Sequence, residues 1–309
     1  MSKPPDLRQI FDPPDEIIQA GLDGNLVFFV GAGASMLLGF PSWKGLANQA
    51  LDDLRKNGLL NYSELEQLKS LDPKQQLSIA NLIAKDNKTN LDLAKHLTGK
   101  NEGDSIYKAI NNVGCSCVTT NYDELLSPRF KEIKDGSTTA KIPNRVAERD
   151  KFFTKLLNEP GTVVHLHGVV SKPETMIVST KDYLEHYDNA QVKEFLGELF
   201  EKKTVLFLGY GLEEAEILEH ILRRGSVKQT SERRRFALQG FFNGQKPLFE
   251  NLHNYYEQSF GVHLLGFIRD HENYKQLEGI IKLWANQIEI KKPPLVSDGD
   301  FLHEVLDGN

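Results

Sequence analysis

Runs of consecutive apolar residues recur along the chain, and stretches with apolar residues three or four positions apart separate them. The first pattern is typical of strands buried on both faces of a parallel sheet, and the second of amphipathic helices. The strand-like runs are Leu26–Val30, Cys115–Thr120, Thr162–Leu166, Thr204–Leu208, Phe236–Phe241 and Val262–Phe267. The alternation predicts an α/β protein with a Rossmann-like parallel sheet and helices on both faces.

The distance between the first two strand-like runs is unusually long. Segments between them, such as "KQQLSIANLIAK" and "SIYKAINNV", have helical spacing. An ordinary dinucleotide-binding fold places a second strand, ending in Asp or Glu, about 20 residues after its glycines. Asp52 and Asp53 lie near that distance but within a helical pattern, so the interpretation as a nicotinamide dehydrogenase fails. The sequence instead predicts an inserted helical module at about residues 45–113.

The remaining segments suggest three parts of the chain. We expect an N-terminal segment over 1–24, a nucleotide-binding catalytic domain over 25–290, and a tail over 291–309 that begins with two lysines and two prolines. Residues 125–160 are polar, and we expect them to be partly helical. The N-terminus has no apolar signal region, and no stretch approaches the ~20 apolar residues of a membrane span. We therefore expect a cytoplasmic protein without membrane contact.

Charge and cysteine content exclude some functions. The formal net charge is −6, whereas sequence-independent binding of nucleic acid needs a basic face, so no direct nucleic-acid partner is expected. The two cysteines, Cys115 and Cys117, lie in one strand-like run. They are too few for a disulfide framework or a four-cysteine zinc site, and we expect them to be small buried strand residues in a reducing compartment.

Chemically distinctive residues follow four of the apolar runs. The groups are Gly31-Ala32-Gly33-Ala34-Ser35, Thr119-Thr120-Asn121-Tyr122-Asp123, His165 to Gly168, and Gly209-Tyr210-Gly211. Because parallel strands end at one edge of a sheet, we expect these groups to lie close together. The small residues of the first turn would allow a pyrophosphate to approach the backbone, although the third glycine of G-x-G-x-x-G is replaced by Met36.

These ordered motifs resemble those of the sirtuin family. "GAGAS…GFPSW" looks like the cofactor-binding loop, "TTNYD" like the Thr-Gln-Asn-x-Asp motif, "LHG" like the catalytic His-Gly, and "FLGYG" like the late glycine loop, together spanning roughly residues 25 to 270. "PSW", "TTNYDELL" and "LGYG" are most similar to the bacterial branch that destroys NAD in antiphage defence. The resemblance implies NAD as the substrate.

Two departures from the family pattern change what is implied. Sirtuin deacylases carry a four-cysteine zinc ribbon between the His-Gly motif and the late glycine loop, but residues 168–208 contain no cysteine. No zinc and no metal ligands are therefore expected. The branch usually has Ser where this chain has Gly211, and Asp-Pro-Asp where this chain has Glu214-Ala215-Glu216. A role for residue 211 therefore depends on its backbone alone.

The resemblance assigns catalytic roles to Asn121, His167 and Asp123. Asn121 would position a water or a ribose hydroxyl, and His167 would accept a proton near neutral pH. Asp123 would support the developing cation or orient Asn121, or it caps a helix beginning near Glu124. His165 lies two positions from His167, so on a continuing strand both point to one face, and we expect His165 to have a supporting or structural role.

The binding residues implied by the same motifs surround the cofactor. They are Gly31, Ala32, Gly33, Ser35, Trp43, Thr120, Gly209, Tyr210 and Gly211. Trp43 has two interpretations, either as a residue of the hydrophobic core or as one that closes over the nicotinamide end.

The sequence therefore predicts an NAD+ glycohydrolase that acts in bacterial antiphage defence by depleting NAD. Alternatives are an NAD-dependent protein deacylase, which the missing cysteines disfavour, and a non-catalytic NAD or ADP-ribose sensor, which the Asn121–His167 pair disfavours. An unregulated NAD hydrolase would kill its host, so we expect gating by assembly into a homo-oligomer or by a separate protein. The resemblance implies HerA-like ATPases or Argonaute proteins as such partners.

Overall fold

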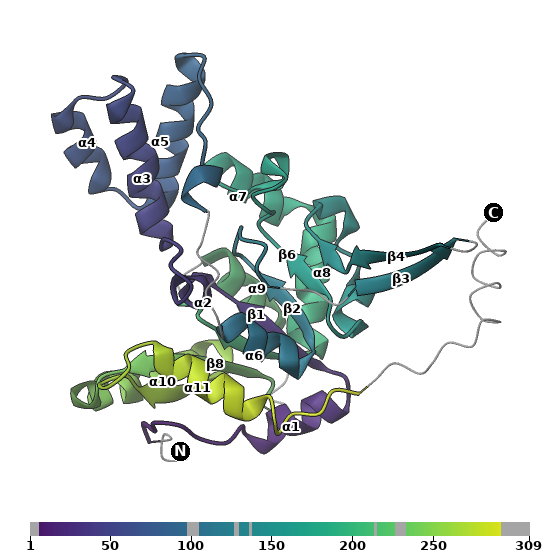
Figure 1. The fold of residues 1–309 in the computed structure, drawn as a ribbon. Coiled ribbons are helices and arrows are strands. Elements are labelled where there is room, and N and C mark those ends of the chain that lie inside the picture. Colours follow the sequence, from purple (N-terminus) through teal and green to yellow (C-terminus); the bar gives the residue numbers. More distant parts are fainter. Residues whose placement is uncertain are drawn as a thin grey trace.

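A seven-stranded sheet forms the centre of the computed structural model, which describes residues 6–97, 105–126, 130–135, 138–212, 215–225 and 233–291 (Figure 1). All its strand pairs are parallel. The strands are β1 (Leu26–Val30), β2 (Ser116–Thr119), β5 (Arg145–Val146), β6 (Val163–His165), β7 (Thr204–Leu208), β8 (Arg235–Phe241) and β9 (Val262–Ile268). The predicted fold class is confirmed, and every predicted run contains a strand.

The strand order creates a crevice at one edge of the sheet. The order is β5-β6-β2-β1-β7-β8-β9, so the chain adds strands on one side of β1 and then continues on the other side. Val30 at the end of β1 pairs with both Thr119 of β2 and Leu208 of β7, so these three strands end level with one another. A reversal of this kind separates the following turns and opens a ligand site at the carboxyl ends of the strands.

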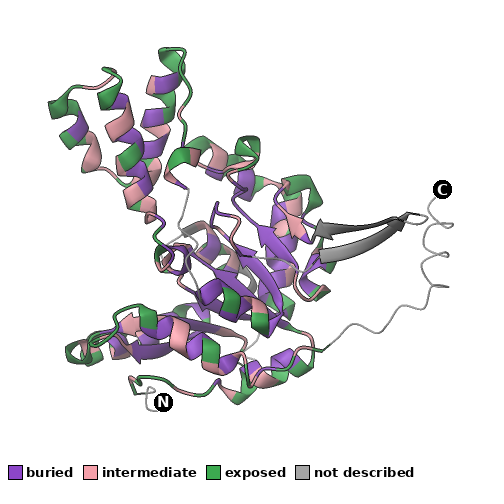
Figure 2. Ribbon diagram, viewed as in Figure 1, coloured by how far each residue is buried: buried purple, intermediate pink, exposed green. Residues whose placement is uncertain are grey.

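Alternate side chains of each central strand enter two separate hydrophobic clusters. In β1, Val27 and Phe29 face one cluster, while Leu26, Phe28 and Val30 face the other. The first face is covered by α7 (Thr180–Asp188), α8 (Ala190–Lys202), α9 (Ala215–Gly225) and α10 (Lys246–Phe260). The second is covered by α1 (Asp15–Leu22), α6 (Ile106–Val113) and α11 (Lys275–Trp284). Figure 2 shows the resulting buried strands between more exposed helices.

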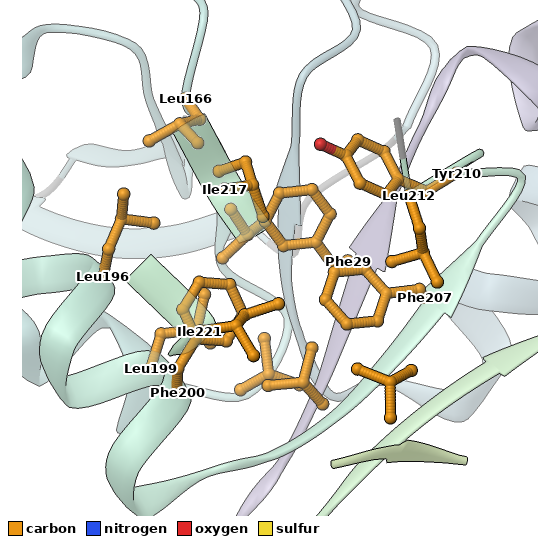
Figure 3. Close-up of a cluster of buried hydrophobic side chains, with 14 of the residues drawn as sticks. Phe29, Leu166, Leu196, Leu199, Phe200, Phe207, Tyr210, Leu212, Ile217 and Ile221 are labelled. Carbon is orange, nitrogen blue, oxygen red and sulfur yellow. The ribbon is translucent and has the colours of Figure 1, made fainter. Parts of the chain in front are cut away.

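Aromatic rings fill much of the first cluster beneath the crevice (Figure 3). Phe29 lies 5.1 Å from Phe207 and 6.4 Å from Phe200, measured between ring centroids. Tyr210, just beyond β7, packs on the same Phe29 ring at 5.0 Å. This packing holds the turn after β7 against the turn after β1.

Three helices form a module that stands apart from the sheet (Figure 1). They are α3 (Trp43–Lys56), α4 (Tyr62–Lys69) and α5 (Pro73–Asp86), and they share their own hydrophobic core. Local capping defines where they begin: Ser42 accepts from the amide of Gly45, Asn61 forms a capping box, and Asp72 precedes a proline at the first helical position. Helix α6 lies within the predicted insertion but packs on the sheet beside α11.

Residues 125–160 are partly helical, as we expected, but they also contain strands that the sequence analysis did not predict. They contain an antiparallel hairpin of β3 (Phe130–Asp135) and β4 (Thr138–Pro143), then β5 and two 3-10 helices, η2 (Arg149–Lys151) and η3 (Thr154–Asn158). The hairpin projects from the body of the molecule (Figure 1). Its strands, "FKEIKD" and "TTAKIP", carry too few apolar residues to be recognised by hydrophobicity.

Short elements complete the described chain. They are α2 (Ala32–Met36), η1 (Ala94–His96), η4 (Pro173–Thr175) and η5 (Asn243–Gln245). Cys115 and Cys117 are buried and free, as predicted. Within the described ranges no helix has both the length and the apolar character needed to span a bilayer. The predicted tail lies outside the described residues after Lys291, and the proposed domain boundaries stay a prediction.

Candidate active site

The turns that follow β1, β2, β6 and β7 border one cleft of about 770 Å³. The helical module supplies its opposite wall, including Trp43, Leu46 and Lys74. The structure brings these predicted site residues to the cleft: Ala32, Gly33, Ser35, Trp43, Thr120, Asn121, Asp123, His167, Gly209, Tyr210 and Gly211. Gly31 does not line it and lies at the contact between the two glycine turns. A volume of this size is typical of sites for small molecules and cofactors.

The glycines after β1 and β7 are required because their two turns pack backbone against backbone. Gly31 donates its N–H to Leu208, and Gly33 donates to the carbonyl of Gly209 at 2.8 Å. A Cβ on Gly31 or Gly33 would lie 2.7 or 2.8 Å from the oxygen of Gly209, closer than atoms pack. Ala32 lines the cleft, and its amide donates to none of the described residues.

The side chain of Asn121 is held by its amide nitrogen. Nδ2 donates to the carbonyl of Gly31 and to the hydroxyl of Tyr107, both at 3.0 Å. A carbonyl can only accept, so the atom facing Gly31 must be the nitrogen. Both N–H groups are therefore used, and the oxygen Oδ1 is the amide atom left to a ligand in the cleft. The backbone N–H of Asn121 donates to Thr119 at 3.1 Å, which fixes the turn itself.

Tyr107 on α6 connects three predicted site residues, and the sequence alone did not identify it. Its hydroxyl accepts from Asn121, donates to Oδ2 of Asp123 at 3.2 Å, and lies 2.9 Å from the hydroxyl of Ser35. Burial raises the pKa of Tyr107, and the charge of Asp123 raises it further, so the phenol stays protonated and can donate. The available signal was a polar hydroxyl on the otherwise apolar face of its helix.

Asp123 acts as an acceptor within this buried group. Ser35 donates to its Oδ2 at 2.7 Å, and the amide of Leu125 donates to its Oδ1 at 3.2 Å. Burial raises the pKa of Asp123, although these hydrogen bonds oppose that rise. The expectation that it caps a helix near Glu124 is wrong, because residues 124–126 are not helical. The hydroxyl of Ser35 donates within the protein rather than toward the cleft.

His167 lies in a turn beyond the end of β6. It is 2% exposed, its Nε2 is 2.7 Å from the hydroxyl of Tyr187, and its ring meets that of Tyr183 edge-on at 5.1 Å. Gly168 follows with a φ of +83°, and a Cβ there would overlap the carbonyl of Thr175. The glycine after the histidine therefore permits the turn that presents His167 to the cleft.

His165 does not share a face with His167, contrary to the expectation from strand alternation. Strand β6 ends at His165, and the two-residue alternation ends with it. His165 is fully buried, and its Nδ1 lies 3.1 Å from the backbone carbonyl of Asn121. Burial lowers the pKa of His165 to about 4, so the neutral ring donates from Nδ1 to that carbonyl. His165 thereby holds the backbone of the turn at Asn121 in place.

Two charged side chains that line the cleft pair with each other. Lys74 at the start of α5 forms an ion pair with Glu216 of α9 at 2.5 Å, and its Nζ lies 4.0 Å above the ring of Tyr183. All three line the cleft. Trp43 does so too, while its ring packs on Tyr122 at 5.9 Å between two hydrophobic clusters. Its place in the core is therefore confirmed, and its contact with a nicotinamide end stays a prediction. The module is thereby attached to the sheet across the site.

Comparison with known proteins defines the class. Residues 116–260 match the family model of the SIR2-like domain. This part of the chain is therefore similar to a SIR2-like domain, which confirms the sirtuin-like resemblance seen in the sequence. The matched region contains Asn121, His167 and the turn after β7.

Its relatives include two proteins named as NAD(+) hydrolases and one named as a defence-associated sirtuin. The chain is 25% identical over 217 residues to NAD(+) hydrolase ThsA of Cytobacillus dafuensis, a match that covers 68% of this chain and 40% of the relative. The match to NAD(+) hydrolase ThsA of Enterococcus faecium is 26% identical and covers 64% and 39%. That to Defense-associated sirtuin 2 of Bacillus subtilis is 26% identical and covers 64% and 19%. The chain thus spans well under half the length of each.

Proposed function

We propose that this protein hydrolyses NAD+ to nicotinamide and ADP-ribose. The observation that carries the proposal is that the amide of Asn121 and the imidazole of His167 border one cleft, next to the packed glycine turns after β1 and β7. An acceptor oxygen and a base beside a cofactor-sized cavity are the groups that hydrolysis of an N-glycosidic bond requires.

The chemistry follows from the bond that breaks. Nicotinamide leaves as a neutral base with the bonding electron pair, and the ribose carbon becomes an oxocarbenium-like centre. A water molecule adds its oxygen to that carbon and releases a proton. The free Oδ1 of Asn121 accepts a hydrogen bond from the water or a ribose hydroxyl, and His167 accepts the proton, a step worth typically ~10²–10⁴-fold in rate.

Neighbouring residues position these two groups. Tyr187 holds the ring of His167, while Tyr107 and Asp123 hold the amide of Asn121. We propose two effects of Asp123. It orients Asn121 through Tyr107, and its negative charge stabilises the cation that develops on the ribose.

The remaining predicted residues supply the binding surface. Ala32, Gly33, Thr120, Gly209 and Gly211 line the cleft. We propose that their backbones approach the phosphates and the ribose of the cofactor. We assign the apolar ring of Trp43 to the nicotinamide end. Tyr210 forms the floor through its ring, because that ring packs on the core (Figure 3).

The test is an NAD+ assay with and without an acetyl-lysine peptide. The chain, Asn121→Ala and His167→Ala are incubated with NAD+, and nicotinamide is measured by chromatography. We expect release without peptide and a loss of at least ~100-fold in both variants. The control is His271→Ala, since His271 is exposed and does not line the cleft. Equal rates in all variants would refute the assignment, whereas peptide-dependent release indicates a deacylase, and binding without turnover a sensor.

The name of one relative, Defense-associated sirtuin 2, supports a role in defence. We propose that NAD+ depletion by this protein limits phage infection, and that assembly into a homo-oligomer or a separate protein, such as a HerA-like ATPase or an Argonaute protein, gates the activity. Light scattering run beside the NAD+ assay tests this gating. A monomer that hydrolyses NAD+ at the full rate would contradict it.

A further inference from the structure

Three potential metal ligands meet at the side of the sheet away from the cleft. His253 and Glu257 lie one turn apart on α10, and His263 lies near the amino end of β9. Each offers a ligand atom within 4.8 Å of the other two. The cleft is at the carboxyl ends of the strands, so this group does not belong to it.

The distances suit a small divalent cation. His253 Nε2 is 3.0 Å from one carboxylate oxygen of Glu257, and His263 Nδ1 is 3.5 Å from the other. Zinc binds imidazole nitrogen and carboxylate oxygen at about 2.0–2.2 Å in a tetrahedron, which places neighbouring ligand atoms roughly 3.4 Å apart. Two imidazoles and a carboxylate are a zinc donor set that leaves one position for water.

The hydrogen bonds of His253 direct its lone pair into the group. Its Nδ1 lies 3.3 Å from the carbonyl of Leu264, which can only accept, so Nδ1 carries the proton. In the neutral ring, Nε2 then presents a lone pair to the carboxylate of Glu257. Two acceptors at that distance repel each other unless a proton or a metal cation lies between them, and a bound metal meets this requirement without protonating His253. A backbone carbonyl on the far nitrogen is also the usual way in which proteins orient a zinc-binding histidine.

His263 supplies an independent observation. The residue is 9% exposed, and its Nδ1 is buried without a hydrogen-bond partner among the described residues. Buried polar atoms are normally paired, so an unpaired nitrogen aimed at a carboxylate needs an explanation. The rings of His253 and His263 meet edge-on with centroids 4.7 Å apart, and Phe236 packs on His263, so the nitrogen is held in place.

An ion can reach this group from solvent, and one arginine competes with it for Glu257. The side chain of Glu257 is 33% exposed, which gives an ion a route from solvent. Arg233 lies outside the group, with its Nε 3.5 Å from Glu257, and is itself 43% exposed. Its long chain can move away when a metal compensates the carboxylate.

We propose that His253, Glu257 and His263 bind a zinc ion, with water as the fourth ligand. The ion would tie the second half of α10 to the start of β9, the edge strand of the sheet, across Gly261. The expectation from sequence of no zinc concerned the cysteine ribbon, and this site uses none of it. The proposal is independent of NAD hydrolysis.

The test uses the whole chain, stripped with a chelator and titrated with zinc against a colorimetric chelator. We expect one equivalent to bind and the melting temperature to rise with zinc concentration, because an ion that binds only the folded state stabilises it. Glu257→Gln keeps the shape of the side chain and should bind roughly 100-fold more weakly or worse, since even outer partners of metal ligands cost ~10–100-fold. X-ray absorption of the complex should show two imidazoles.

Two controls separate this site from other histidines. His96→Gln alters a histidine that pairs with Asp53, and His167→Gln alters the cleft; both should bind zinc as the unaltered chain does. Failure of the unaltered chain to bind zinc, or equal binding by Glu257→Gln, would overturn the proposal. In that case the cluster is an ion pair of protonated His253 with Glu257. Loss of binding only in His167→Gln would place the zinc in the cleft and would also overturn it.

Discussion

The buried His165 makes the stability of the protein depend on pH in a specific range. Its pKa is lowered to about 4 by burial, whereas the unfolded chain titrates near the ordinary value of 6.5. Between these values the unfolded state binds a proton that the folded state does not bind, so lower pH favours unfolding. The contribution of His165 is complete above pH 6.5 and is lost as the pH falls through about 4.

The magnitude follows from the shift. One pKa unit corresponds to 1.36 kcal/mol, so the whole window corresponds to about 3 kcal/mol. Between pH 6.5 and 5.0 the loss is about 2 kcal/mol, because the folded ring is still largely neutral there. His165 is fully buried, so solvent screening does not reduce this value.

The assay compares His165→Asn with the unaltered chain by urea unfolding at pH 7.5 and 5.0. The Asn side chain can still donate to the carbonyl of Asn121 but does not titrate. The unaltered chain should lose about 2 kcal/mol more than the variant across this interval, since all other titrating groups are shared. The exposed His271→Asn should behave as the unaltered chain does.

An equal loss in both proteins, or a larger loss in the variant, would refute the reasoning. If His165→Asn does not fold, the ring can be titrated directly by NMR in the unaltered protein. A measured pKa near 6.5 would then refute the effect of burial.

Three further substitutions test the site. Tyr107→Phe removes the hydroxyl that donates to Asp123, so the unfolding free energy should fall by about 1–3 kcal/mol and kcat for NAD+ should fall with it. Urea unfolding and the nicotinamide assay measure these two effects. An unchanged kcat would contradict the positioning role of Tyr107. Gly168→Ala places a Cβ in a left-handed turn, which should lower the unfolding free energy by roughly 1–3 kcal/mol. It should also lower kcat by displacing His167. Full activity of this variant would show that the turn does not position the histidine. Lys74→Met should change the unfolding free energy by less than about 1 kcal/mol but raise KM for NAD+, because a cation at the cleft is lost. Steady-state kinetics measure KM, and an unchanged KM would exclude a binding role for Lys74.

Local patterns were sufficient to place the sheet and most of the candidate site. Strands β1 and β7 were predicted to the residue, because a central parallel strand is apolar on both faces and ends where glycines or polar residues begin. Edge strand β5 has only two residues, and the β3–β4 hairpin has a polar composition, so neither has such a signal. The ends of parallel strands meet at one edge, so four motifs far apart in the chain could be assigned to one cleft.

Other features depend on contacts that no local pattern specifies. The face of His165 was mispredicted because alternation holds only while the strand continues. The hydroxyls of Tyr107 and Tyr187, which hold Asn121 and His167, come from helices whose packing decides which atoms meet.

The sequence by itself determined which residue types stand at the strand ends, because strand and turn preferences act over a few residues. Only the tertiary structure decided which atoms of these residues are already bonded, which nitrogen of His253 carries a proton, and that His263 faces Glu257. Those properties depend on distances of a few ångströms between separate elements, and such distances exist only after the helices have packed on the sheet.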